Sequence, residues 1–106
     1  MGSVVYHVVG ERAHLGEGEV RCVVVEGREI ALYRIGGEFF ATGDTCTHAH
    51  GSLSEGYVEG EEIECPLHGG CFNIRTGEAT CPPATEALAT YEVKVEGENI
   101  LVGIRA

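Results

Sequence analysis

The stretch DTCTHAHGSLSEGYVEGEEIECPLHGGC, residues 44–71, carries three cysteines and three histidines within 28 residues. Four of them form two short clusters, Cys46-Thr47-His48 and Cys65-Pro66-Leu67-His68, with 16 residues between. Each cluster offers one thiolate and one imidazole from a single short loop, so both ligands reach a metal with little loss of chain entropy. The spacing therefore predicts a metal site with four ligands, Cys46, His48, Cys65 and His68.

Two kinds of metal centre accept two cysteines and two histidines. A structural zinc ion takes this ligand set, but its loops more usually hold like pairs such as Cys-x2-Cys. A [2Fe–2S] cluster takes it with two cysteines on one iron and two histidines on the other, so that each loop gives one ligand to each iron. The mixed loops of this chain favour the iron–sulfur cluster. A zinc-stabilised interaction module stays open as an alternative of another class.

The pattern Cys-x-His, 16 residues, Cys-x2-His resembles the signature of the Rieske family. The resemblance implies one [2Fe–2S] cluster, with Cys46 and Cys65 on one iron and His48 and His68 on the other. It also implies that the histidine-bound iron lies nearer the surface, where an electron can leave. The proline pair 82–83 falls where Rieske proteins place a loop that covers the cluster.

The loops depart from those of high-potential Rieske proteins in four places. Proteins of that type typically add one cysteine to each ligand loop and place a serine and a tyrosine hydroxyl near the cluster. The matching positions here are Gly51, Leu67, Gly70 and Phe72. Because fewer hydrogen bonds to sulfur stabilise the reduced cluster less, we expect a potential near the low end of the Rieske range, roughly −150 mV.

These departures make the chain similar to the soluble Rieske ferredoxins of bacterial aromatic-ring-hydroxylating dioxygenase systems. The resemblance implies a carrier of single electrons from an NADH-dependent flavoprotein reductase to a terminal oxygenase, without catalytic residues of its own. The alternative within the fold is the Rieske-like small subunit of assimilatory nitrite reductase. Many members of that group lack the four metal ligands that this chain has. The aromatic substrate of the oxygenase cannot be inferred from its electron carrier.

Length and composition limit the other classes of function. A chain of 106 residues predicts a single domain, and 16 glycines predict the many tight turns of an all-β fold. The net charge of −10 argues against nucleic acid and anionic membranes as partners. No apolar run approaches the roughly 20 residues of a membrane span, and the first residues do not form a secretory signal. We therefore expect a cytoplasmic protein, with a monomer as the default.

Alternating apolar residues predict strands on both sides of the cysteine- and histidine-rich stretch. We expect strands at 4–9, 20–25, 28–35, 38–42, 71–74, 91–95 and 99–104. They predict a Rieske fold: an antiparallel, β-sandwich-like base with an inserted cluster-binding subdomain of short strands and loops, at about residues 44–83 within the single domain 1–106. Because proline cannot continue a central strand, Cys81-Pro82-Pro83 is expected to be a loop.

Several other residues compete for roles near the cluster. His50 fits no Rieske spacing, and we expect it at the surface or behind the ligands. Cys71 is expected to pack beneath the cluster as a small apolar side chain, and Cys22 to lie in the core. A Cys71–Cys81 disulfide is conceivable, although a reducing compartment argues against it. Five glutamates separate the ligand loops, and they predict either a docking surface or a solvated β face: Glu55, Glu59, Glu61, Glu62 and Glu64.

Overall fold

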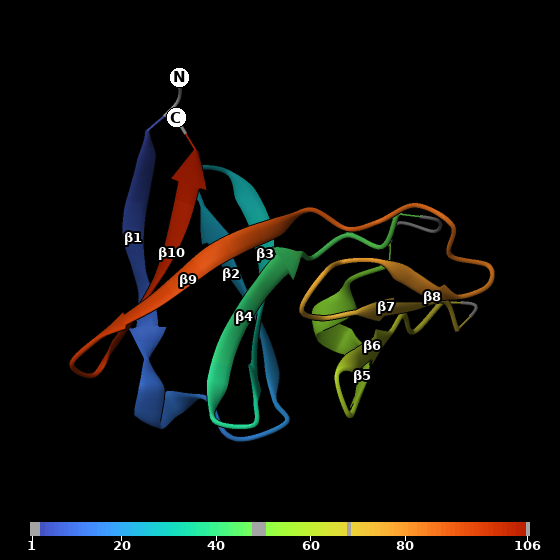
Figure 1. The fold of residues 1–106 in the computed structure, drawn as a ribbon, viewed down its shortest axis with the longest axis horizontal. Coiled ribbons are helices and arrows are strands. Elements are labelled where there is room, and N and C mark those ends of the chain that lie inside the picture. The colour runs from blue at the N-terminus through green and yellow to red at the C-terminus, as the bar shows by residue number, and fades with distance from the viewer. Residues whose placement is uncertain (1–2, 48–50, 68, 106) are drawn as a thin grey trace.

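The computed structural model describes residues 3–47, 51–67 and 69–105. Within them the chain forms ten strands in two antiparallel sheets, together with two 3-10 turns, η1 (Arg12–His14) and η2 (Leu53–Glu55) (Figure 1). This arrangement confirms the predicted all-β fold. Within these residues no helix has the length and apolar character needed to span a membrane.

The six-stranded sheet, called the base below, has the order β1-β10-β9-β4-β3-β2. Its strands are β1 (Val4–Glu11), β2 (Val20–Val25), β3 (Arg28–Ile35), β4 (Glu38–Gly43), β9 (Thr90–Glu96) and β10 (Asn99–Arg105). Strands β1, β10 and β9 form one half of the base, and β4, β3 and β2 form the other. The two halves join where β4 pairs with β9, which gives the base its sandwich-like form. Apolar side chains fill the space between the halves: Leu15, Val25, Ile30, Leu32, Ala41, Ile100, Val102 and Ile104.

Turn chemistry explains why the predicted hairpins of the base form. Glu26 and Gly27, which connect β2 to β3, have φ angles of 51° and 77°. Positive φ at both central residues gives the type I′ turn, whose twist matches that of the paired strands. The turn fixes the register by pairing Val25 with Arg28. The expectation for Cys22 was wrong, because this register leaves its side chain exposed on β2.

The second sheet lies inside the predicted insert, and residues 44–83 are called the cluster-binding region below. It has the order β5-β6-β7-β8, and every strand is three residues long: β5 (Tyr57–Glu59), β6 (Glu62–Glu64), β7 (Cys71–Asn73) and β8 (Ala79–Cys81). The prediction of a loop at Cys81 was wrong at that residue, which ends β8 and pairs with Cys71. The loop begins at Pro82, where the backbone donor needed for strand pairing is missing.

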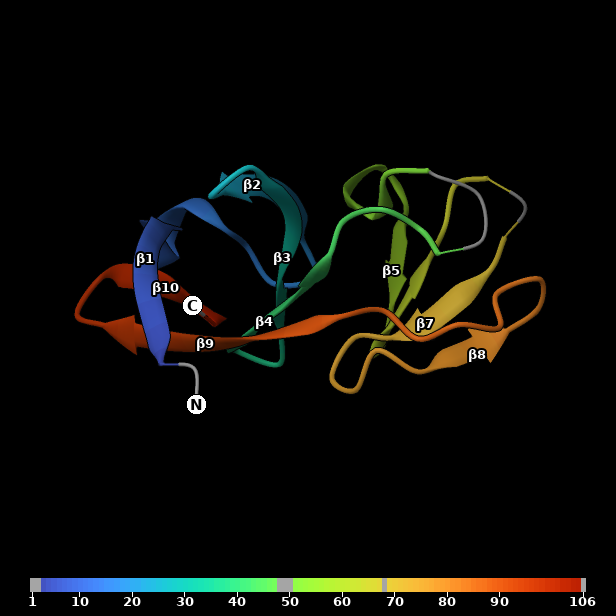
Figure 2. The same cartoon turned by 90° about the horizontal axis from the view of Figure 1, so that it is seen from above.

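Strand β3 connects the two regions, because it is buried on both faces. Ile30 and Leu32 point into the core of the base, whereas Ala31, Tyr33 and Ile35 point into a second core that β3 shares with the cluster-binding region. Alternate residues of a strand face opposite sides, so one strand supplies both cores. Figure 2 shows the four short strands lying beside β3 and β4. Cys46 and Cys65, which begin the two ligand loops, belong to this second core.

Candidate metal centre

The first ligand loop leaves β4 and folds back on itself. The N–H of Cys46 donates to the carbonyl oxygen of Gly51 at 2.8 Å, which closes a loop of six residues. Asp44 is buried just before the loop, and its Oδ1 accepts a hydrogen bond from the N–H of Ser54 at 2.8 Å. This carboxylate therefore holds the chain that enters the loop against the η2 turn that follows it. The predicted ligand His48 and its neighbour His50 lie outside the described residues.

The second ligand loop repeats this closure. The N–H of Cys65 donates to the carbonyl oxygen of Gly70 at 2.7 Å, again from a cysteine to a glycine five residues later. Gly69 has a φ of 73°, in the left-handed region where glycine is favoured. The two loops thus share one local design, in which a cysteine at the start is tied to a glycine at the end. The fourth predicted ligand, His68, lies outside the described residues.

The structure brings the two predicted cysteine ligands together in the interior. Cys46 and Cys65 are 2% and 0% exposed. Burial raises the pKa of the Cys65 thiol; the N–H of Leu67 facing its sulfur lowers it, and the neighbouring Cys46 thiol raises it. Two adjacent buried thiols are costly to ionise without a cation, whereas metal binding deprotonates them. The cysteine pair therefore fits one iron of a [2Fe–2S] cluster, with a backbone N–H directed at sulfur.

Glycines allow the two loops to approach each other this closely. A methyl group at Gly51 would lie 3.1 Å from Cys65 Sγ and 3.1 Å from Leu67 Cγ. A methyl group at Gly56 would collide with the carbonyl oxygen of Glu64, because the chain after η2 runs directly against β6. The extra cysteine of a high-potential loop would need this space at position 51. The geometry thus agrees with the choice of glycine there.

The segment after β8 lies against the first ligand loop. Thr47 Oγ1 donates to the carbonyl oxygen of Glu86 at 2.8 Å, and this contact holds the chain that follows Pro82 and Pro83 close to that loop. Both prolines are exposed, as is Leu67 at 45%. These positions form an apolar margin beside the ligand loops. That the prolines cover the cluster stays a prediction.

Cys71 does not lie where the sequence suggested. Its neighbour Phe72 is buried in the core, so the alternation of β7 turns Cys71 towards the outer face of the sheet, where it is half-buried. Its partner in register is Cys81, and both are free cysteines in the structure. The described part of the chain has one group of possible metal ligands, formed by these two cysteines and Glu62. This group is separate from the predicted cluster ligands.

Sequence reasoning missed two residues that shape the site. Asp44 was unassigned, although a buried carboxylate next to a ligand loop is rare unless it is hydrogen-bonded. Gly51 was noted only as the place of a missing cysteine, whereas a side chain there would meet the sulfur of Cys65. A signal for Asp44 was available in its position two residues before Cys46, where an acidic side chain can accept hydrogen bonds from the loop backbone.

Comparison with known proteins identifies the family. A family model described as the Rieske [2Fe-2S] domain matches residues 5–92. The naphthalene 1,2-dioxygenase system ferredoxin component of Pseudomonas aeruginosa is 49% identical over 88 residues, covering 83% of this chain and 85% of the relative. A chain in the solved complex of reduced oxygenase and oxidized ferredoxin in carbazole 1,9a-dioxygenase is 41% identical, with a TM-score of 0.89 and 92% of each chain covered.

A third comparison concerns the nitrite reductase alternative. The putative NADH-dependent nitrite reductase small subunit of Mycobacterium tuberculosis matches with a TM-score of 0.88 over 98% of each chain, but at 20% identity it shares the fold alone. The nearer relatives are electron-transfer components of dioxygenase systems. The chain belongs to the Rieske [2Fe–2S] family, and the cofactor of that family is one [2Fe–2S] cluster.

Proposed function

We propose that the chain carries single electrons from an NADH-dependent flavoprotein reductase to the terminal oxygenase of an aromatic-ring dioxygenase system. The similarity to a naphthalene dioxygenase ferredoxin over 83% of the chain supports this role most strongly. The bound cluster supplies the one-electron chemistry, and the chain supplies ligands, shape and charge around it. The protein is accordingly an electron-transfer component and not an enzyme.

We assign four ligands to the cluster: Cys46 and Cys65 on one iron, and His48 and His68 on the other. The adjacent, buried positions of the two thiols support the first half of this assignment. The second half rests on the sequence spacing, in which His48 follows Cys46 by two residues and His68 follows Cys65 by three. Replacing either histidine with alanine is expected to abolish cluster binding, as iron analysis will show.

The potential is expected to lie near −150 mV, at roughly the low end of the Rieske range. A side chain at Gly51 would crowd Cys65 Sγ, with its Cβ at 3.1 Å, and Phe72 is fully buried in the core. Neither position supplies a disulfide or a hydroxyl donor. A clearly positive midpoint in a redox titration would contradict this proposal.

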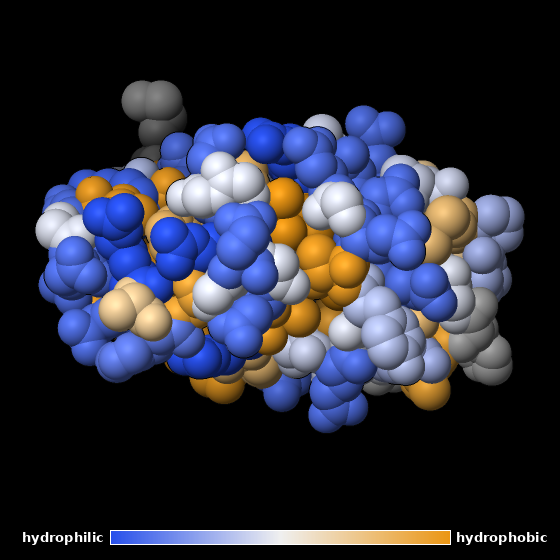
Figure 3. Space-filling model, turned by 90° about the horizontal axis from the view of Figure 1, so that it is seen from below, coloured by the Kyte–Doolittle hydropathy of each residue, from blue (hydrophilic) through white to orange (hydrophobic). Residues whose placement is uncertain are grey.

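Docking is expected to involve the margin near the ligand loops, where Leu67, Pro82 and Pro83 are exposed. Of the five glutamates between the loops, Glu61 forms an ion pair with Arg75 at 3.1 Å. Its carboxylate is therefore less available to a docking protein. Hydrophilic side chains spread over both halves of the face in Figure 3, with apolar side chains near its middle. Four of the five glutamates, Glu55, Glu59, Glu61 and Glu64, are exposed, which favours a solvated surface with only local docking through charge.

Transfer assays test the proposal directly. The purified protein is expected to be reduced by NADH through a flavoprotein reductase of a dioxygenase system, and reoxidised by the oxygenase of that system. Such a carrier works in the cytoplasm, as a monomeric single domain. Failure of reoxidation by every aromatic-ring oxygenase tried, with a nitrite reductase large subunit accepting the electrons instead, would overturn the proposal in favour of the alternative.

A further inference from the structure

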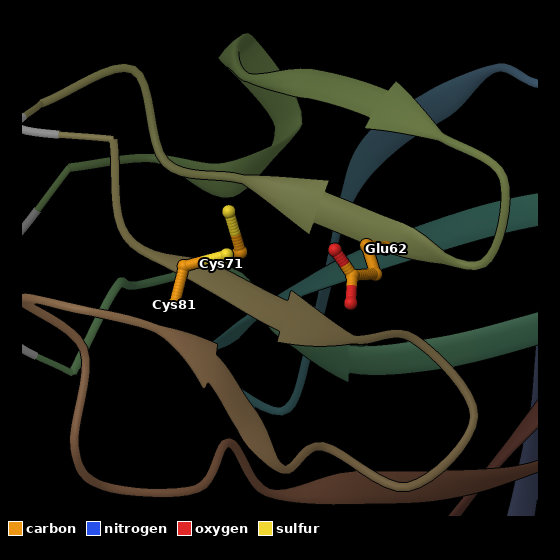
Figure 4. Close-up of side chains that lie close together, drawn as sticks. All are labelled: Glu62, Cys71 and Cys81. Carbon is orange, nitrogen blue, oxygen red and sulfur yellow. The ribbon is translucent and has the colours of Figure 1, made fainter.

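A second group of metal-binding side chains lies on the outer face of the four-stranded sheet. The ligand atoms of Glu62, Cys71 and Cys81 all lie within 4.8 Å of one another (Figure 4). They come from three neighbouring strands, β6, β7 and β8. The convergence therefore depends on the pairing of all three strands, and not on a single flexible loop.

The sheet register explains the convergence. Ile63 and Phe72 are fully buried and opposite each other, so Glu62 and Cys71 both face the other side of the sheet. Glu62 is diagonal to Cys71, whose direct partners are Glu64 on β6 and Cys81 on β8. Diagonal and direct neighbours on one face are within reach of each other. All three side chains are half-buried, which holds them in place and leaves them open to a small ion.

The electrostatic environment of this face is negative. Burial, the thiol of Cys81 and the carboxylates of Glu64 and Glu62 together raise the pKa of Cys71 to about 12. Each of the neighbouring groups acts against a further negative charge on the sulfur. A bound cation removes this cost, because it coordinates the thiolate and its positive charge offsets the charge of the carboxylate.

We propose that Glu62, Cys71 and Cys81 form a second metal site, for a borderline-soft divalent cation such as Zn²⁺. Two cysteine sulfurs and one carboxylate oxygen are established zinc ligands, and three protein ligands leave a fourth tetrahedral position for water. The site is distinct from the cluster, whose cysteine ligands are buried within the core. It lies at the end of the second ligand loop, because Cys71 directly follows Gly70. An ion there would tie together the strands that carry this loop.

A disulfide between Cys71 and Cys81 is the rival use of the same pair. Forming it removes two electrons and two protons, and needs an oxidant such as a peroxide, which is thereby reduced. The carboxylates near Cys71 oppose this reaction, because they disfavour the thiolate that must attack. A divalent cation, by contrast, uses the carboxylate of Glu62 as well as both sulfurs. The composition of the group therefore favours the metal.

Zinc uptake by the cluster-loaded protein tests the proposal. The protein is dialysed anaerobically against buffered Zn²⁺, and zinc and iron are measured per chain. We expect about one zinc per chain with the iron unchanged, and loss of the zinc in the double variant Cys71→Ser/Cys81→Ser. Glu62→Gln is expected to weaken zinc binding at least tenfold, by roughly the factor seen when supporting groups of a metal site are removed. Cys22→Ser and Glu98→Gln, both at exposed positions, are the matched controls and are expected to bind zinc normally.

Two results would overturn the proposal. One is zinc uptake that is the same in the double variant and in the wild type, or that comes at the cost of iron, since the ion would then occupy another place. The other is a Cys71–Cys81 disulfide in freshly purified, anaerobic protein, detected by the mass of the linked peptides. If the double variant fails to fold, Glu62→Gln and the single variant Cys81→Ala decide the question, because each removes one ligand only.

Discussion

The base and the cluster-binding region are built from the same kind of secondary structure but are held together differently. Strands of the base run for six to eight residues around a core of purely apolar side chains. Strands of the cluster-binding region are three residues long, and the core beneath them includes the thiols of Cys46 and Cys65. The difference teaches that apolar burial suffices for the base, and it predicts that the second region relies on a metal bound by those thiols.

Removing a cysteine ligand is expected to have the largest effect, because it should destabilise the cluster-binding region and leave the base intact. Cys65→Ser is expected to abolish the cluster, lowering the iron content from about two per chain to near zero. Without the metal, the amide protons of β5 to β8 should exchange with solvent far faster, while those of β3 and β10 stay protected. Iron analysis and hydrogen exchange check the two parts of this expectation.

Cys22→Ser is the control for that experiment, because Cys22 is exposed on the base. It should keep both the iron and the exchange pattern of the wild type. If Cys65→Ser loses its iron but keeps the cluster-binding region as protected as before, the region does not depend on its metal. Equal loss of protection in β3 would show instead that the two regions unfold as one unit.

Truncating one core residue in each region compares the two cores. Phe72→Ala opens the core under the ligand loops and Ile100→Ala opens the core of the base, and both side chains are nearly inaccessible. We expect losses of about 3–5 and 2–5 kcal/mol in the free energy of unfolding. Only Phe72→Ala should release the cluster well below the global melting temperature, as visible absorbance followed during heating will show. Release at the same relative temperature in both variants would contradict separate cores.

A methyl group between the ligand loops is a milder test. Gly51→Ala places its Cβ 3.1 Å from Cys65 Sγ, whereas Gly43→Ala meets no atom within 4 Å. Overpacking at Gly51 is expected to cost about 1–3 kcal/mol and to speed loss of the cluster, measured as bleaching in the presence of a chelator. Gly43→Ala should bleach at the wild-type rate. Equal rates in the two variants would show that the loops have room to separate.

The smallest expected effect concerns β3, which both regions share. Tyr33 is buried, and its hydroxyl lies 2.8 Å from Thr42 Oγ1. Tyr33→Phe removes this hydrogen bond and is expected to cost about 1 kcal/mol in a denaturant titration at neutral pH. Cluster content should not change, because Thr42 still donates to the carbonyl oxygen of Gly43.

The same variant has a pH signature. Burial raises the pKa of Tyr33 above its ordinary value of 10.0. Its contribution to stability is therefore complete below pH 10 and is lost as the pH rises above that value, where the unfolded chain ionises first. The stability of the wild type should fall more steeply above pH 10 than that of Tyr33→Phe. Parallel curves would contradict a buried, protonated Tyr33.

Local patterns made the base predictable from the sequence. The boundaries of β2 and β3 were predicted correctly, because alternating apolar residues flank a turn at Glu26 and Gly27 that suits a hairpin. The pairings of β1 with β10 and of β4 with β9 were not predicted. These contacts join distant segments, and no local signal specifies which long-range partner a strand will take.

The cluster-binding region was predictable in its chemistry more than in its geometry. Cysteine and histidine spacing indicated the Rieske family, which the family comparison confirms, while the assignment of the four ligands stays a prediction. Strand β8 was missed because three residues carry too little pattern, and prolines follow at once. The outward position of Cys71 depends on the register of β7 against two short neighbours. A shift of one residue there would have reversed it.

Pulsed electron paramagnetic resonance of the reduced protein tests the central claim most directly. The claim is that one [2Fe–2S] cluster is held by Cys46 and Cys65 on one iron and by His48 and His68 on the other. It predicts hyperfine coupling from two histidine nitrogens to the reduced cluster, since His48 and His68 would both bind one of its irons. A reduced cluster without nitrogen coupling, or a colourless protein that holds zinc in place of iron, would contradict it.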